Sequence, residues 1–149
     1  MSGMIFGTLI GLVTGYFGGW LDNLFMRVVD VMLAFPGVLL AILIVSILGS
    51  GSESVIVALT IWFIPTFGRI VRGSVLSLRE REFIESARAI GASSGGILFR
   101  HILMNSISPI LVYMTLSIST SILTAAALSF LGLGTQPPTP EWGALMSTG

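Results

Sequence analysis

Few residue types in this 149-residue chain could carry out covalent or metal chemistry. His101 is the only histidine, and no cluster of carboxylates lies near it in the sequence, so neither a metal site nor a general base is expected there. The lack of cysteine excludes a disulfide framework and a thiolate metal site. The lack of lysine excludes a P-loop ATPase, whose phosphate-binding turn requires one. We therefore expect no catalytic residue, no metal and no cofactor, and the chain is not predicted to be an enzyme.

The hydroxyl side chains could be structural or could contact a solute. Four serines near the polar loop have no histidine–carboxylate partners in the sequence, which favours helix caps and backbone hydrogen bonds. These serines are Ser74, Ser77, Ser106 and Ser108. A second group, Ser117, Ser121 and Thr124, shares one face of the last apolar segment. This group could line a polar substrate path, because polar groups within a membrane tend to face a cavity, or it could bond the preceding helical turn.

The segment 77–110 is the one long polar stretch of the chain and holds four of its seven arginines. Ser77-Leu78-Arg79-Glu80 matches a capping box, which predicts that a helix begins here. A helical wheel then separates apolar from charged residues onto opposite faces. The apolar face contains Phe83, Ile84, Ala87, Ile90 and Gly91, and the charged face contains Arg81, Glu82, Glu85 and Arg88. The pattern predicts an amphipathic helix of about three turns.

A glycine-rich turn follows this predicted helix. Three glycines in the segment 91–96 permit backbone conformations that bulkier residues resist, and residues 97–103 begin a second short helix. A two-faced helix that projects from a membrane could fit a groove on a partner protein. The same charges could instead form an ordinary solvated face, with ion pairs worth roughly a few tenths of a kcal/mol each.

Composition predicts that the rest of the chain lies in a membrane. The sequence is 54% hydrophobic and 9% charged, and its mean hydropathy is +0.98, whereas soluble domains carry roughly 25% charged residues. We expect an all-α polytopic transmembrane helical bundle that forms one domain over residues 1–149. The spans are predicted at about 4–20, 31–48, 54–71 and 107–131, and the polar loop at about 72–106.

Glycines recur at every fourth position from Gly3 to Gly19 in the first predicted span. Such a bare ridge lets two helix backbones approach closely in lipid. The ridge could be the seam of a homodimer, or it could pack inside a larger bundle, and we favour packing inside a bundle.

The arginines predict the orientation of the chain. With four spans, all seven lie on one side of the membrane, in the connector 21–30 or in the segment 69–106. The positive-inside rule then makes the loop 72–106 cytoplasmic and leaves both termini outside. A formal net charge of zero offers no support for nucleic-acid binding.

The polar loop resembles a known motif. Residues 85–91, followed by Ile102-Leu103 and Asn105, resemble the "EAA" loop of binding-protein-dependent ABC importer permeases. Two positions depart from the motif: Met104 stands where the family usually has proline, and Ser86 stands where it usually has alanine. The methionine implies a softer bend at the entry to the last span.

The resemblance extends over nearly the whole chain. Residues 82–109, 127–134 and 136–143 look like the second permease of dipeptide, oligopeptide and nickel importers, and residues 30–36 are similar to the same subfamily. Such permeases have roughly six spans, so the resemblance implies that this chain is a fragment lacking the first and last spans.

The resemblance implies a transport function by alternating access, in a multi-pass protein of a bacterial or archaeal inner membrane. It implies cytoplasmic ATP-binding subunits, a second permease chain and an extracytoplasmic substrate-binding protein as partners, with the tail 136–149 as a candidate contact for the last. The loop 77–106 would couple the permease to the ATPase. The implied coupling residues are Phe83, Ile84, Glu85, Ala87, Arg88, Ile90 and Gly91. The apolar ones would fill or back a groove, Glu85 and Arg88 would make polar contacts, and Gly91 would permit the turn.

Two other functions stay open from the residues themselves. The chain could be a membrane scaffold that binds a soluble partner without moving a solute, or a self-assembled channel built on the glycine ridge. The resemblance implies a peptide-like solute, but nickel and other small solutes use similar permeases. The sequence identifies neither the solute nor the partner permease, and it does not show whether a four-span piece folds alone.

Overall fold

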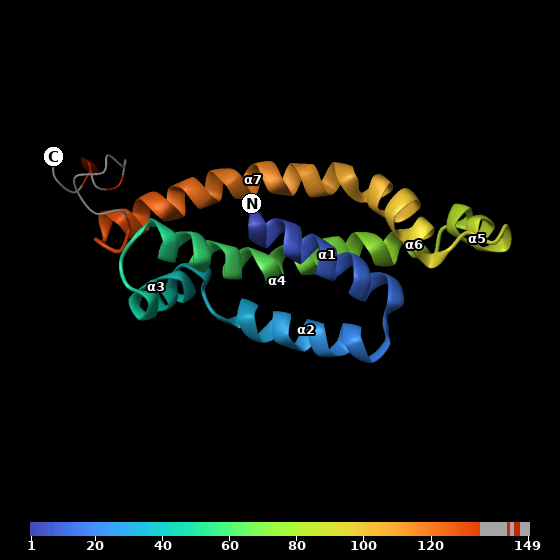
Figure 1. Cartoon of the computed structure of the whole chain (residues 1–149), viewed down its shortest axis with the longest axis horizontal. Coiled ribbons are helices and arrows are strands. Elements are labelled where there is room, and N and C mark those ends of the chain that lie inside the picture. The colour runs from blue at the N-terminus through green and yellow to red at the C-terminus, as the bar shows by residue number, and fades with distance from the viewer. Residues whose placement is uncertain (135–142, 144, 147–149) are drawn as a thin grey trace.

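The computed structural model describes residues 1–134, 143, 145 and 146, and every element in them is helical. The elements are α1 (Ser2–Phe17), α2 (Gly19–Ala34), α3 (Gly37–Leu48), α4 (Ser52–Arg79), α5 (Glu82–Ala89), α6 (Ser94–Gly96), the π-helix η1 (Ile97–Ile102) and α7 (Leu103–Phe130). Figure 1 shows α4 and α7 running along the length of the molecule, with α5 at one end and α3 near the other. The predicted all-α bundle is confirmed.

Within the described residues, two helical stretches are long and apolar enough to cross a membrane: α4, with 28 residues, and the continuous stretch Ser94–Phe130, with 37. The predicted spans 54–71 and 107–131 correspond to parts of these stretches. The predicted span 4–20 corresponds to α1, which has 16 residues and is shorter than a typical span. Membrane crossing by α1 therefore stays a prediction.

The predicted span 31–48 is broken in the structure. Residues 21–30, expected to be a connector, are helical within α2, and the chain bends by 89° between α2 and α3. Phe35 is extended at the break (φ −86°, ψ 135°), as the residue before a proline prefers to be. Only if α2 and α3 act together do the described residues hold a third span.

The glycine ridge of α1 packs against α4 of the same chain. A Cβ at Gly3 would lie 2.3 Å from the Thr60 carbonyl oxygen, and one at Gly11 would lie 2.5 Å from that of Gly68. The two backbones approach this closely because glycine has no side chain. Residue numbers rise together along the contact, from Gly3 and Thr60 to Gly11 and Gly68, so α1 and α4 are parallel. The ridge is therefore a seam within the bundle and not a homodimer surface. Gly19 leaves the ridge, since its φ is +69° and a Cβ placed there would meet no atom within 4 Å.

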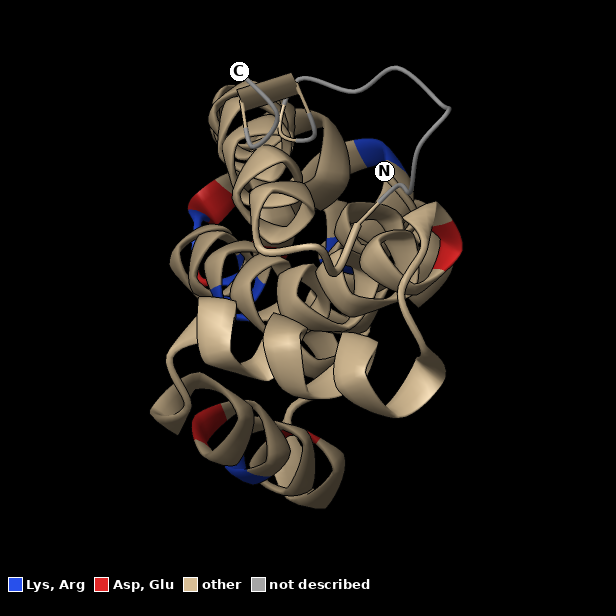
Figure 2. Ribbon diagram, turned by 90° about the vertical axis from the view of Figure 1, so that its left-hand side faces the viewer, with Lys and Arg blue, Asp and Glu red and all other residues tan. Residues whose placement is uncertain are grey.

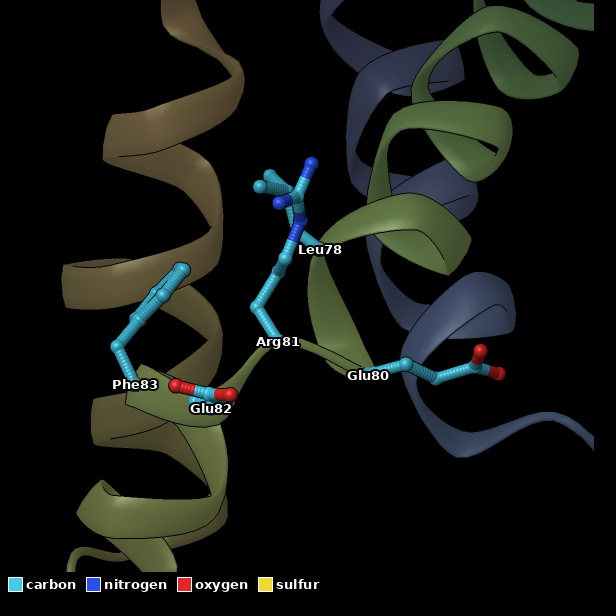
Figure 3. A pocket seen from close by; sticks show the side chains of 5 residues that line it. All are labelled: Leu78, Glu80, Arg81, Glu82 and Phe83. Carbon is cyan, nitrogen blue, oxygen red and sulfur yellow. The ribbon is translucent and has the colours of Figure 1, made fainter.

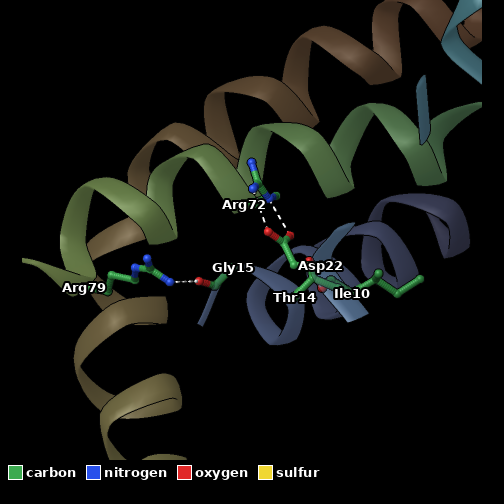
Figure 4. A network of polar contacts seen from close by, with 6 residues as sticks. All are labelled: Ile10, Thr14, Gly15, Asp22, Arg72 and Arg79. Carbon is green, nitrogen blue, oxygen red and sulfur yellow. Dashed lines mark hydrogen bonds and ion pairs between the residues drawn. The ribbon is translucent and has the colours of Figure 1, made fainter. Parts of the chain in front are cut away.

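Two ion pairs hold α2 on α4. Arg72 donates to both carboxylate oxygens of Asp22, over 2.5 and 2.6 Å, and the Asp22 side chain is only 9% exposed (Figure 4). Arg69 pairs with Asp30, but these side chains are 46% and 65% exposed. Figure 2 shows that uncharged residues make up most of the bundle in this view. The buried pair therefore carries most of the polar contribution to this interface.

The predicted capping box is wrong. α4 continues through Ser77, whose hydroxyl donates to the Ser74 carbonyl oxygen over 2.8 Å, and it ends at Arg79. The next helix, α5, begins after Arg81 without a side-chain cap. Val75 explains the difference, because it is fully buried in the core at this end of the bundle and keeps α4 helical beyond the predicted stop.

Candidate docking loop at the end of the bundle

The helix α5 lies beyond the ends of α4 and α7 and is anchored by two side chains (Figure 1). Ile84 is completely buried and Ala87 is 6% exposed. Both belong to a core cluster formed by α1, α4, η1 and α7. The other buried members are Leu12, Val71, Val75, Ile97, Leu98, Ile102 and Ile110. The cluster holds α5 in a defined position at the end of the long helices.

The predicted apolar face of α5 is divided by the structure. Ile84 and Ala87 face the core, but Phe83 is 41% exposed and Ile90 is 86% exposed. Glu85 is also exposed. The reason is geometric: only a narrow side of a short helix can face the single cluster that supports it. The outward residues therefore combine apolar and charged side chains on the exposed surface of α5.

The helix α5 is shorter than predicted, because its eight residues make about two turns. It ends in a Schellman motif: the Gly91 N–H donates to the Arg88 carbonyl oxygen over 3.0 Å, and the Ala92 N–H donates to that of Ala87 over 3.0 Å. Gly91 has φ +83°, which a residue with a Cβ adopts only with strain. The predicted turn is therefore present at Gly91, and the coupling role of this residue stays a prediction.

The predicted six-residue glycine turn is shorter in the structure. Ser93 caps α6, with its hydroxyl oxygen accepting the Gly96 N–H over 3.2 Å, so Gly95 and Gly96 are helical. The chain then passes through η1 directly into α7. The second short helix predicted at 97–103 is therefore not separate but is the first part of the long stretch Ser94–Phe130.

Two open hollows flank α5. One, of about 320 Å³, is lined by Tyr16, Arg79, Glu80, Glu85 and Arg88. The Arg88 guanidinium lies 5.8 Å from the centre of the Tyr16 ring, within the range of a cation–π contact. Arg79 donates to the Gly15 carbonyl oxygen over 3.2 Å and so joins the end of α4 to α1 (Figure 4).

The second hollow, of about 680 Å³, is lined by Leu78, Glu80, Arg81, Glu82 and Phe83. Figure 3 shows that Glu80 and Arg81 point in different directions from the junction between α4 and α5. The acidic residues Glu82 and Glu85 lie in the first turn of α5 and Arg88 in its last, which complements the helix dipole.

Sequence reasoning missed Tyr16 and the Arg79 contact with α1. Arg79 and Gly15 are 64 positions apart, so no local pattern links them. A search for arginines that follow a long apolar segment would have found Arg79 but not its acceptor. Among the described residues, no group of three or more histidine or carboxylate side chains could hold a metal ion.

The residues predicted to line a substrate path are mostly buried in this chain. Ser117 and Thr124 are 6% and 7% exposed, on the side of α7 that faces the bundle. Ser121 donates to the Ser117 carbonyl oxygen over 2.6 Å, which is a bond to the preceding turn. The tail 136–149, expected to meet a binding protein, lies outside the described residues except at positions 143, 145 and 146.

Comparison with known proteins gives a single family. Residues 7–149 match the family described as binding-protein-dependent transport system inner membrane component. The chain is 55% identical over 147 residues to the glutathione transport system permease protein GsiD of Pectobacterium atrosepticum, covering 99% of this chain and 49% of the relative.

Two further relatives are similar to the same extent. The dipeptide transport system permease protein DppC of Alkalihalophilus pseudofirmus is 55% identical over 144 residues, covering 97% of this chain and 47% of the relative. GsiD of Escherichia coli O157:H7 is 58% identical over 145 residues, covering 97% and 48%. The chain thus spans about half the length of the curated relatives it matches.

Proposed function

The chain belongs to the family of binding-protein-dependent transport system inner membrane components, and from this premise we propose that it is part of the permease of an ATP-driven importer. In this proposal the loop 77–106 is cytoplasmic and docks on a separate ATP-binding subunit. A second permease chain completes the path through the membrane, and an extracytoplasmic binding protein delivers the solute.

The observation that supports this proposal best is the way α5 is held. Ile84 and Ala87 fasten it to the same core that contains Val71 of α4 and Ile110 of α7. A force applied to the outer surface of α5 therefore reaches both long helices through packed side chains. A flexible loop without these buried contacts would not transmit the movement of a docked subunit to α4 and α7.

The outward residues then take distinct roles. Phe83 and Ile90 fill apolar parts of the groove on the ATP-binding subunit, and Glu85 and Arg88 make polar contacts with it. Ile84 and Ala87 support the docking surface from behind, because they are buried in this chain. Gly91 provides the turn that sets α5 against α6.

The cycle that follows is alternating access. ATP binding draws two ATP-binding subunits together, and each subunit carries its docked loop with it. Because α5 shares a buried core cluster with α4 and α7, the tilt of these helices changes and the central path opens to the other side of the membrane. No covalent chemistry in this chain is needed.

We propose peptides or similar small solutes as the cargo, since the relatives are named for glutathione and dipeptide transport. Ser117 and Thr124 would contact the cargo path in the complete permease. In this chain they lie against the bundle, so such a role requires a cavity formed together with further helices.

Site-directed cross-linking tests the docking, because the chain has no native cysteine. Ile90→Cys is the reporter, since Ile90 is 86% exposed, and Ser50→Cys in the exposed turn between α3 and α4 is its control. A cysteine at Ala87 would be a poor reporter because this position is buried. We expect the ATP-binding subunit, carrying a cysteine in its groove, to cross-link to position 90 and not to position 50. Cross-linking at both positions or only at 50 would refute the docking.

Uptake by the reconstituted importer separates transport from the two other functions. A transport role predicts uptake of a labelled dipeptide or glutathione that requires ATP and the binding protein. A scaffold predicts no uptake despite cross-linking at position 90. A channel predicts flux without ATP and without any partner.

A further inference from the structure

The junction between the docking loop and α7 is a π-turn. The Leu103 N–H donates to the carbonyl oxygen of Leu98, five residues back, where an α-helix would use the residue four back. The α-helical pattern resumes at Leu103. A single π-turn within an α-helix holds one residue more than an α-helical turn, so one backbone carbonyl group loses its usual N–H donor.

A side chain adds a hydrogen bond at this junction. The Asn105 amide nitrogen donates to the His101 carbonyl oxygen over 2.6 Å. This side-chain bond ties the π-turn to the first turn of α7. The π-turn is thus stabilised from within, which makes it a defined state of the helix.

The next residue shows the opposite situation. Ser106 is completely buried, and its hydroxyl group has no hydrogen-bond partner. Elsewhere in α7 the hydroxyl groups of Thr115, Thr120 and Ser121 each donate to the carbonyl oxygen four residues back. A buried hydroxyl group without a partner destabilises the state that contains it. A register of this turn that gives the Ser106 hydroxyl group a partner would therefore gain stability at this position.

Pro109 supplies a second place for the π-turn. Proline has no N–H, so in an α-helix the Asn105 carbonyl group loses its partner at position 109. A π-turn over residues 105–110 would pair that carbonyl group with the Ile110 N–H instead. The helix thus has two compatible positions for a single wide turn, and they are about two helical turns apart.

We propose that the π-turn is a sliding joint that moves along the helix between residues 97–102 and Pro109 as the docking loop moves. Residues 103–108 then rotate about the helix axis by on the order of 100°, the angle of one residue, while α5 and the rest of α7 keep their register. The proposal rests on the proposed function, because the docked ATP-binding subunit is what drives the loop.

Paired fluorescent probes test the sliding in the assembled importer. Met104 and Leu116 lie on either side of Pro109, and their side chains are 61% and 60% exposed. Each is replaced by cysteine in a separate protein and labelled with an environment-sensitive dye. A trapped ATP analogue is expected to shift the emission at position 104 and to leave position 116 nearly unchanged. Equal shifts at both positions would mean that α7 moves as a rigid body, and would overturn the proposal.

Deletion of Phe99 removes the extra residue and converts the turn to α-helix without changing the register on either side. We expect it to abolish both the emission shift at position 104 and ATP-driven uptake, while cross-linking at position 90 persists. Phe99→Ala keeps the chain length and should keep both activities. Uptake and emission shift at the wild-type level in the deletion protein would overturn the proposal.

A substitution at Pro109 tests the sliding joint if the protein with Phe99 deleted fails to insert into the membrane. Pro109→Ala restores the missing N–H and removes the second position, so it should abolish the shift at position 104, whereas Pro65→Ala in α4 should not. An unchanged shift with Pro109→Ala would overturn the sliding joint. Failure of the proposed function is separate: in that case the unmodified importer shows neither ATP-driven uptake nor cross-linking at position 90.

Discussion

The α1–α4 seam and α5, the helix proposed to dock on a partner, are held in opposite ways. At the seam, glycines bring the two backbones into contact, and at Gly11 a single added carbon would collide with the Gly68 carbonyl oxygen. At α5, two buried side chains carry the attachment and the rest of the helix is free to face outward. Contact between backbones makes a rigid pair that offers no recognition surface. Attachment by a few side chains leaves chemistry available for a partner. The molecule therefore separates its tightly packed frame from its proposed docking surface.

Gly11→Leu should break the seam and have the largest effect. A leucine cannot fit where a Cβ would lie 2.5 Å from the Gly68 carbonyl oxygen, so we expect a loss of about 3 kcal/mol or more in stability. Thermal unfolding in detergent measures it. Gly73→Ala in α4 is the control, because a Cβ there would meet no atom within 4 Å. Equal stability of the two variants would show that the seam is not tightly packed.

Arg72→Ala tests whether the packing of α2 on α4 depends on the buried ion pair, in the way that the packing of α1 on α4 depends on glycine. It leaves the Asp22 carboxylate buried without its partner, and should lower the unfolding free energy by about 3 kcal/mol. Arg69→Ala breaks an exposed pair and should cost less than about 1 kcal/mol. Chemical denaturation of both variants checks the ranking, which a similar loss in each would contradict.

Ile84→Ala tests the attachment of α5. It removes a fully buried side chain at the edge of the core, where the neighbouring helix can partly close the space, so we expect a loss of about 2 kcal/mol. Proteolysis at the loop should also become faster, because α5 detaches more often. A normal melting temperature and normal protease resistance would show that α5 is held by something else.

Gly91→Ala sharpens the comparison by changing the angle of α5 without changing its packing. A left-handed conformation costs an alanine about 1 kcal/mol, which is small for the whole bundle but acts directly on the turn. We expect cross-linking at position 90 to fall while the thermal stability changes little. Unaltered cross-linking would mean that the turn tolerates other conformations.

Ile90→Ala should have the smallest effect on stability and a clear effect on docking. The side chain is 86% exposed, so the unfolding free energy should change by less than about 0.5 kcal/mol. Binding of the purified ATP-binding subunit should weaken, because an apolar contact is lost. Ser86→Ala, at an exposed position on the same helix, is the control and should bind normally. Equal binding by both would remove Ile90 from the docking surface.

The sequence predicted the elements whose signals are local. The long apolar helices, the amphipathic α5 and the glycine at position 91 all follow from composition and periodicity over a few turns. The division of the α5 apolar face does not, because the burial of Ile84 and the exposure of Phe83 depend on where the supporting cluster lies. Asp22 and Arg72 are 50 positions apart, and no local pattern pairs them.

The helix start predicted at Ser77 is absent, which shows that a capping pattern alone does not determine where a helix begins. Its spacing to Glu80 fits a capping box, but Val75 and Leu78 pack on the core and keep α4 helical. Burial therefore decides where this helix ends. The π-turn has no compositional signature either, since only hydrogen-bond geometry distinguishes it from an α-helix.

The parallel packing of α1 on α4 has a consequence for synthesis. Val75 contacts the glycine ridge near Gly15, and it is 60 positions later in the chain. At roughly 5–20 residues per second, a ribosome needs several seconds to make that stretch. During this interval the glycine face of α1 lacks its contacts with α4. This face of α1 is thus open to membrane chaperones and proteases until α4 arrives, and any delay in translation between the two helices lengthens that exposure.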